Sequence, residues 1–155
     1  MWESWADCSS DLRKGGNLTG GVGGPRSLNH AFFGTVDDWL FTHVAGINPT
    51  APGFRQIQIK PHPVGDLTKA SAFQTTALGR VAARWMRSAA GEFTLHIEIP
   101  VGATAEVFVP SHHLRNVTEG GTSAGQAAGV TFLELRDGHA VFEVGSGTYE
   151  FRSRL

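Results

Sequence analysis

The chain has 155 residues, the length of one ordinary domain, and a domain of this size buries roughly 70% of its unfolded surface without needing disulfides or metals. Its 13 basic and 14 acidic residues give a net charge of -1, which lacks the basic excess of nucleic-acid-binding proteins and argues against a nucleic-acid partner. With 20 glycines, 7 prolines and 10% aromatic residues, the composition favours a β-rich protein with many turns over a helical bundle.

The single cysteine, Cys8, excludes an internal disulfide framework. No window reaches the roughly 18 apolar residues of a membrane span, so we expect no membrane partner. The first residues carry no cationic stretch followed by an apolar run, so they do not have the pattern of a secretory signal. Cellular location, cytoplasmic or secreted, is left open.

In chain order, the first 26 residues are rich in glycine pairs and are predicted to form a loop. From Ser27 the pattern becomes that of an amphipathic helix ending at Gly46, a residue suited to the left-handed position after a helix. Its apolar stripe contains Phe33, Val36, Leu40, Val44 and Ile47, widened by Phe32 and Trp39. The segment 48–53 contains two prolines and cannot continue the helix. We therefore expect a domain boundary there, dividing the chain into residues 1–50 and 51–155.

After this boundary the apolar residues alternate with polar ones, which is typical of half-buried strands. The alternation is clearest over 92–99, and 80–86 repeats it with Val81, Ala83 and Trp85 on one face and Arg80, Ala82, Arg84 and Met86 on the other. Further strands are predicted over 55–60, 68–76, 105–109, 130–135, 140–144 and 148–152, with a tight turn at Asp137-Gly138. Eight short strands predict a mainly β fold, an antiparallel two-sheet β-sandwich.

The predicted helix carries more aromatic surface than a lone helix beside a sandwich needs. Such a face is suited to packing against other helices, so residues 1–50 resemble the end of a larger helical domain. We expect the isolated chain to be prone to association through this surface.

A set of motifs in a fixed order resembles the C-terminal region of bacterial α-L-rhamnosidases. Its first part comprises Trp2-Glu3-Ser4-Trp5, Ser27-Leu28-Asn29-His30, Gly34-Thr35-Val36-Asp37-Asp38-Trp39, Ala45-Gly46-Ile47 and Pro52-Gly53. The part in the predicted sandwich comprises Ile59-Lys60-Pro61, Gly79-Arg80-Val81 with Trp85, Ile99-Pro100 with Gly102, Ala105-Glu106-Val107-Phe108-Val109-Pro110 and Gly147-Thr148-Tyr149-Glu150-Phe151. The glycine-rich loop and residues 112–129 carry none of the motifs on which this resemblance rests.

The resemblance implies an enzyme with an (α/α)6 catalytic barrel followed by a C-terminal β-sandwich, of which this chain would hold the end of the barrel and the sandwich. It implies inverting hydrolysis of terminal α-L-rhamnose from a rhamnosylated glycoside or polysaccharide, with Glu3 as general base and the general acid earlier in the barrel. Trp2 and Trp5 are then predicted to line the sugar pocket, and His30 resembles the family histidine that contacts the sugar. No cofactor is implied.

Structural interpretations stay open for each of these residues. Glu3, taken alone, is a solvated charge near a chain end, and Trp2 and Trp5 are ordinary core or interface residues. His30 is a neighbour of a helix cap. The adjacent His112 and His113 point to opposite faces of a strand, so we predict no metal site.

Two functions follow from these patterns. In the first, the chain is part of an α-L-rhamnosidase, inactive alone because the general acid is missing, and its partner is the remainder of the barrel. In the second, the sandwich is a non-catalytic carbohydrate-binding or structural module, which predicts exposed aromatic side chains on one sheet face. The alternation places most aromatic residues of the sandwich in the core and leaves Phe108 as the clearest exception.

Overall fold

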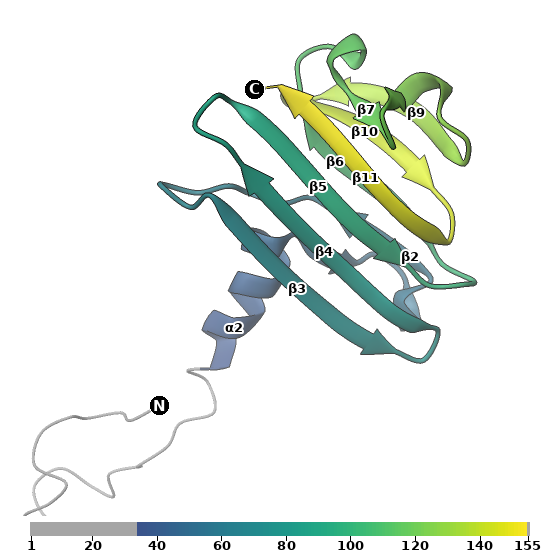
Figure 1. The fold of residues 1–155 in the computed structure, drawn as a ribbon. Coiled ribbons are helices and arrows are strands. Elements are labelled where there is room, and N and C mark those ends of the chain that lie inside the picture. The colour runs from purple at the N-terminus through teal and green to yellow at the C-terminus, as the bar shows by residue number, and fades with distance from the viewer. Residues whose placement is uncertain (1–33, 155) are drawn as a thin grey trace, which may run out of the picture. The chain divides into compact units, whose positions relative to one another are not determined.

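The computed structural model describes residues 34–154, which form two stacked β-sheets preceded by a short helical segment (Figure 1). The five-stranded sheet contains, in spatial order, β1 (Ile47–Pro49), β2 (Gln56–Ile59), β6 (Thr104–Pro110), β10 (His139–Val144) and β9 (Val130–Arg136). The six-stranded sheet contains β3 (Lys69–Thr76), β4 (Gly79–Arg87), β5 (Glu92–Ile99), β11 (Gly147–Arg154), β7 (Thr118–Glu119) and β8 (Thr122–Ser123). Short 3-10 turns lie at Pro52–Phe54, Leu114–Asn116 and Ala124–Gln126. The predicted β-sandwich is confirmed.

Each of the eight predicted strands is present, and β5 has the predicted bounds. The Asp137-Gly138 turn is confirmed as well, since both residues have positive φ (51° and 76°) between the paired strands β9 and β10. Strands β1, β7 and β8 were not predicted. These strands have two or three residues each, which is too short for an alternating pattern to be visible.

One strand pair departs from the expected antiparallel arrangement. β2 and β6 pair in parallel, with Ile57 opposite Ala105 and Ile59 opposite Val107. Between them the chain passes through β3, β4 and β5 in the other sheet and then returns. Because no hairpin joins β2 to β6, nothing forces the two strands to run in opposite directions.

The core lies between the two sheets and is formed by the inward-facing positions of both. Trp85 stacks on Phe93 with ring centroids 6.1 Å apart, and Phe142 stacks on Phe151 at 5.3 Å. All four aromatic side chains are fully buried. The alternation read from the sequence therefore assigns the core face of β4, β5, β10 and β11 correctly.

The helical segment is not one regular α-helix. An α-helical turn, α2 (Thr35–Trp39), continues as a π-helical turn over Leu40–Ala45 and ends at Gly46, where φ is 83°. The Gly46 N–H donates to the Phe41 carbonyl at 3.1 Å, so the prediction that Gly46 ends the helix is confirmed. The part of the predicted helix before residue 34 lies outside the described residues.

Groups of the sandwich hold the carbonyls of the last helical turn. The Asn48 side-chain amide donates to the Thr42 carbonyl at 2.9 Å, and the His62 N–H donates to the His43 carbonyl at 3.1 Å. The Trp85 indole donates to the Val44 carbonyl at 2.8 Å. Carbonyls at a helix end lack partners within the helix, and these donors explain how the segment ends inside the sandwich. A boundary between two compact units falls between Asp38 and Trp39.

Candidate functional site

The predicted general base, Glu3, and the predicted sugar-binding residues, Trp2, Trp5 and His30, lie outside the described residues 34–154. Their roles therefore remain predictions. Within the described part of the chain, no group of three or more His, Cys, Asp or Glu side chains is arranged to hold a metal ion. In the same part, no helix has the length and apolar character that a membrane crossing requires.

The helical segment keeps apolar side chains at the surface. Trp39 and Leu40 are 45% and 46% exposed, and the Trp39 ring stacks on His43 at 5.6 Å. Val36 in α2 is also exposed. On the same segment Val44 is buried and Phe41 packs against the sandwich core. Some apolar side chains of the segment thus pack against the sandwich, whereas others remain exposed to solvent.

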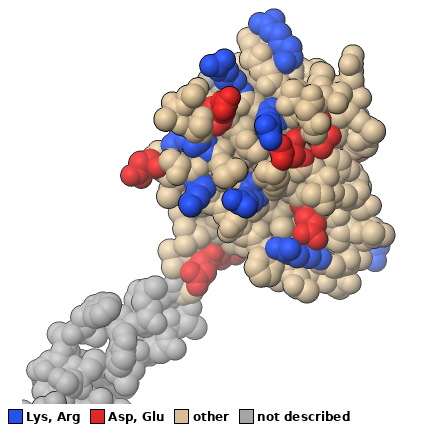
Figure 2. Space-filling view, in the orientation of Figure 1, with Lys and Arg blue, Asp and Glu red and all other residues tan. Residues whose placement is uncertain are grey.

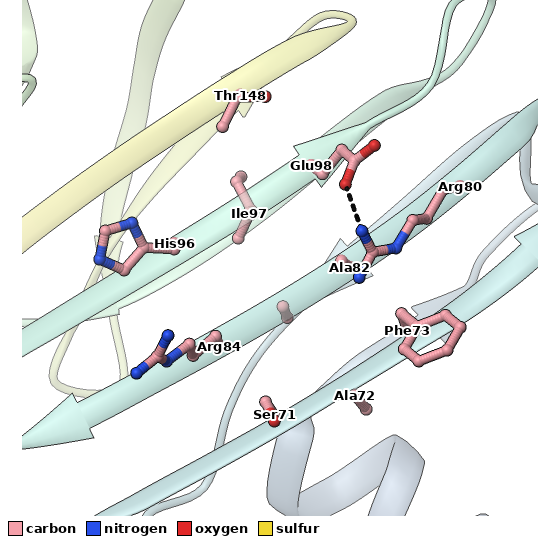
Figure 3. A pocket seen from close by; sticks show the side chains of 11 residues that line it. Ser71, Ala72, Phe73, Arg80, Ala82, Arg84, His96, Ile97, Glu98 and Thr148 are labelled. Carbon is pink, nitrogen blue, oxygen red and sulfur yellow. Dashed lines mark ion pairs between the residues drawn. The ribbon is translucent and has the colours of Figure 1, made fainter.

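A hollow of about 320 Å³ opens on the outer face of the six-stranded sheet (Figure 3). The strand register explains its shape, because Ala82 on β4 lies opposite Phe73 on β3 and opposite Glu98 on β5. A methyl group between two large neighbours leaves a depression. Arg80 and Arg84 project on either side of Ala82 along the same strand, because residues two apart share a face.

The charged groups around the hollow are partly paired. Arg80 forms an ion pair with Glu98 at 3.4 Å and places its guanidinium 4.8 Å from the centre of the Phe73 ring. His96 lies 3.4 Å from Glu150, which also pairs with Arg152. Arg84, by contrast, has no carboxylate within 4 Å among the described residues, and its guanidinium contacts the Met86 sulfur at 3.8 Å. Figure 2 shows basic side chains spread over this face of the molecule with acidic ones between them.

The prediction that Phe108 is an exposed aromatic residue is wrong, because its side chain is only 3% exposed. It does point to the outer face of the five-stranded sheet, but long polar side chains cover it. Lys60 and Arg136 each place their charge 4.9 Å from the ring centre, and the His139 ring meets its edge at 6.0 Å. Alternation predicts the face of a side chain, whereas the cover over that face comes from strands distant in sequence.

His139 itself is partly desolvated by this packing. Burial lowers the pKa of its imidazole, and the nearby positive charges of Lys60 and His62 act in the same direction. The Nδ1–H of His139 donates to the Asp137 carbonyl at 2.8 Å, which opposes the shift because it also favours the charged ring.

Comparison with known proteins shows the family to which this chain belongs. Residues 46–124 match the model of the bacterial alpha-L-rhamnosidase C-terminal domain. The chain belongs to this family. An alpha-L-rhamnosidase of Streptomyces avermitilis is 37% identical over 153 residues, which is 97% of this chain and 13% of that protein.

Solved structures agree with this assignment. The crystal structure of the Streptomyces avermitilis alpha-L-rhamnosidase complexed with L-rhamnose matches with a TM-score of 0.76 at 36% identity, over 99% of this chain and 14% of that one. The alpha-L-rhamnosidase from Dictyoglumus thermophilum gives a TM-score of 0.74 at 36% identity, over 85% and 15% of the two chains. This rhamnosidase C-terminal domain therefore spans only about one seventh of the length of these relatives. The resemblance drawn from the ordered motifs is confirmed.

Neither Phe73 nor Arg84 was predicted as a binding residue, although Arg84 was placed on the face opposite the core. The signal was available for Arg84, since the alternation in 80–86 places Arg80, Ala82 and Arg84 on the outer face. The depression was not visible, because it depends on which residues of β3 and β5 lie opposite Ala82.

Proposed function

We propose that this rhamnosidase C-terminal domain works as part of an α-L-rhamnosidase that hydrolyses terminal α-L-rhamnose from glycosides with inversion. The observation that supports this most is the 37% identity to an alpha-L-rhamnosidase, a match that covers 97% of the chain. The substrate would be a rhamnosylated glycoside or polysaccharide, and the partner would be the rest of the helical barrel.

In this proposal Glu3 is the general base. Its carboxylate takes a proton from a water molecule whose oxygen attacks the anomeric carbon, while the bond from that carbon to the leaving oxygen breaks. A carboxylic acid on the opposite side of the sugar protonates the leaving oxygen, and the two carboxyl groups stand roughly 6.5–9.5 Å apart to leave room for the water. Trp2 and Trp5 would offer flat apolar faces to the sugar, and His30 would hydrogen-bond to a hydroxyl.

The stretch up to residue 50 would supply the end of the barrel, although its last residues, from Val44, are also built into the sandwich. The exposed Val36, Trp39 and Leu40 follow one another closely on the helical segment and support a helical neighbour, since clustered exposed apolar side chains mark interaction surfaces. The general acid is assigned to the preceding part of the enzyme. The chain alone would therefore not turn over substrate.

The test is a chimera in which this chain replaces the C-terminal region of the Streptomyces avermitilis enzyme. Glu3→Gln in the chimera should lower kcat on an aryl α-L-rhamnoside by roughly 10²- to 10⁴-fold, the usual contribution of a general base. Glu92→Gln, on the surface of the sandwich, is the matched control and should keep the activity.

Two further measurements complete the test. A glutamine substitution at the position of the intact Streptomyces avermitilis enzyme that aligns with Glu3 answers the question if the chimera does not fold. Proton NMR of the first sugar released should show β-L-rhamnose, the inverted anomer. Retained activity in both Gln variants would remove Glu3 from the base role, and an α-anomer as the first product would overturn inversion.

A further inference from the structure

We propose that the outer face of the six-stranded sheet binds an acidic oligosaccharide, a sugar chain that carries carboxylate or sulfate groups. The site is the hollow over Ala82 together with the groove that continues from it along β3. This role goes beyond the proposed hydrolysis and does not depend on Glu3. It would hold an acidic polysaccharide near the enzyme while the catalytic site works on another part of it.

The first observation is an aromatic side chain that packing does not require. Phe73 is 61% exposed, the largest exposed fraction among the aromatic residues of the described chain. It stands at the rim of the hollow, opposite Ala82 in the strand register (Figure 3). Phe73 stays this exposed even with the Arg80 guanidinium 4.8 Å from the centre of its ring, so the ring still offers an apolar surface against which the C–H face of a sugar can pack.

The second observation is a positive charge in the site, that of Arg84, which no carboxylate of the described residues balances. Arg80 is balanced by Glu98 at 3.4 Å, and His96 lies against Glu150. Arg84 lines the hollow without a carboxylate partner among the described residues. A planar guanidinium in this state is suited to a bidentate contact with a carboxylate or sulfate, which is the strongest kind of hydrogen-bonded ion pair.

The third observation is the shape of the site. A second hollow, of about 400 Å³, is lined by Lys69, Ala70, Ser71 and Arg84, so it shares Ser71 and Arg84 with the first. The two form a groove along β3 from Phe73 to Lys69, which is about 13 Å at the usual rise of a strand. Both hollows are shallow and open on the same face, which suits a linear chain lying across the sheet better than an enclosed small molecule.

The remaining lining groups favour a sugar chain over an acidic peptide. Ser71, Thr148 and Glu98 line the hollow with hydroxyl and carboxylate groups of the kind that pair with sugar hydroxyls. A peptide that used backbone hydrogen bonds would instead need the free edge of β3, which lies beside the hollow and not within it. The non-catalytic carbohydrate-binding role predicted from the sequence thus acquires a location, with Phe73 in place of Phe108.

The test measures binding to the 155-residue chain by isothermal titration and by amide chemical shifts. The ligands are a hexamer of galacturonic acid, its uncharged methyl ester, a sulfated galactose hexamer and hexaglutamate. We expect the acidic sugars to bind and to shift the amides of β3 and β4, and the methyl ester to bind at least about tenfold more weakly. The two acidic sugars separate carboxylate from sulfate as the preferred group, and binding of either supports the proposal.

The variants are Arg84→Gln and Phe73→Ala, with Arg115→Gln as a control at an exposed arginine outside the groove. Arg84→Gln should weaken binding of the acidic sugars at least about tenfold, Arg84→Lys less, and Phe73→Ala about fivefold. Arg115→Gln should have no effect, and the melting temperature of each variant checks its folding.

Absence of binding by both acidic sugars would overturn the proposal. So would an equal loss in Arg84→Gln and Arg115→Gln, or hexaglutamate binding as tightly as the sugars, since a general basic surface would then account for the result. The readout is binding and not hydrolysis, so failure here leaves the role of Glu3 untouched, and failure of Glu3 leaves this site untouched.

Discussion

The indole N–H of Trp85 donates a 2.8 Å hydrogen bond to the carbonyl of Val44, joining the centre of β4 to the last turn of the helical segment. Both residues are buried, and 41 positions separate them in sequence. The bond satisfies a polar group at each end: an indole N–H that would otherwise be alone in the core and a carbonyl at the end of a helix. It fixes where the helical segment enters the sandwich.

Trp85→Phe should therefore destabilise the protein by about 2–4 kcal/mol, because it leaves the Val44 carbonyl unpaired and removes part of a packed ring system. Denaturation by guanidinium chloride, followed by circular dichroism, measures the change. Tyr149→Phe is the matched control, since it also removes an aromatic donor, but one that is half-buried and 3.3 Å from the Gly145 carbonyl. It should cost less than about 1 kcal/mol. Equal losses in the two variants would contradict the role assigned to the Trp85 bond.

Gly46 lies where the helical segment meets the loop after β2. Its φ of 83° favours glycine, and a Cβ there would come within 2.3 Å of the backbone of Lys60 and Pro61. Gly46→Ala should cost more than about 3 kcal/mol, since backbone on both sides must move. Gly53→Ala has a similar φ of 69° but open space around the new Cβ, and should cost only about 1–2 kcal/mol. The difference between the two losses in unfolding free energy measures the clash at Gly46. Equal losses in the two variants would contradict this clash.

The sandwich was largely predictable from the sequence, for a physical reason. Positions such as Phe93, Leu95 and Ile97 alternate strictly because one face of β5 is buried and the other is not, and this local pattern identifies the strand and its core face. The parallel pairing of β2 with β6 was not predictable, because it depends on a path through three strands of the other sheet. The π-helical turn before Gly46 also depends on distant groups, Trp85 among them.

At the surface site, too, one feature follows from the local alternation and another depends on residues distant in sequence. Alternation places Arg84 on the outer face of β4, but the depression beside it exists because Phe73 and Glu98 lie opposite Ala82 in the register. Register is set by turns and by the whole sheet, so a single strand does not reveal it. The catalytic assignment of Glu3 came from family motifs alone.

The cover over Phe108 leads to a prediction about stability. Phe108 faces outward yet is 3% exposed under Lys60 and Arg136, whereas Phe73 faces outward and is 61% exposed. Phe108→Ala should destabilise the protein by about 3–5 kcal/mol, as for a core residue. Phe73→Ala should cost less than about 1 kcal/mol, consistent with the loss of one exposed contact with Arg80. Thermal or chemical unfolding of both variants checks this, and a small loss at Phe108 would show that its polar cover does not act as core.

The exposed apolar residues of the helical segment predict self-association of the isolated chain. Trp39 and Leu40 are each nearly half exposed. Without the rest of the barrel, the same residues of a second copy are an apolar surface against which they can pack. Sedimentation velocity should show a monomer at low concentration and larger species as the concentration rises. Leu40→Ser should weaken this association, whereas Leu67→Ser, at an exposed leucine in the loop before β3, should not. A chain that stays monomeric at high concentration and binds no hydrophobic dye would contradict this prediction.

His139 should make the stability of the sandwich depend on pH. Burial and the nearby charges of Lys60 and His62 lower the pKa of its ring below the ordinary value of 6.5, so the folded state holds its neutral form more strongly than the unfolded state does. Well above pH 6.5 the ring is neutral in both states, and its lowered pKa then has no effect on the free energy of unfolding. As the pH falls below 6.5, the unfolded chain takes up the proton first, and the free energy of unfolding decreases until the folded pKa is passed. Because His139→Gln removes this titration, the variant should lose less stability than the natural chain between about pH 7.5 and 5.5 when guanidinium unfolding is measured across that range. Parallel pH profiles for the two proteins would show that the ring titrates alike in the folded and unfolded states, and an opposite difference would mean that the Asp137 carbonyl outweighs the burial.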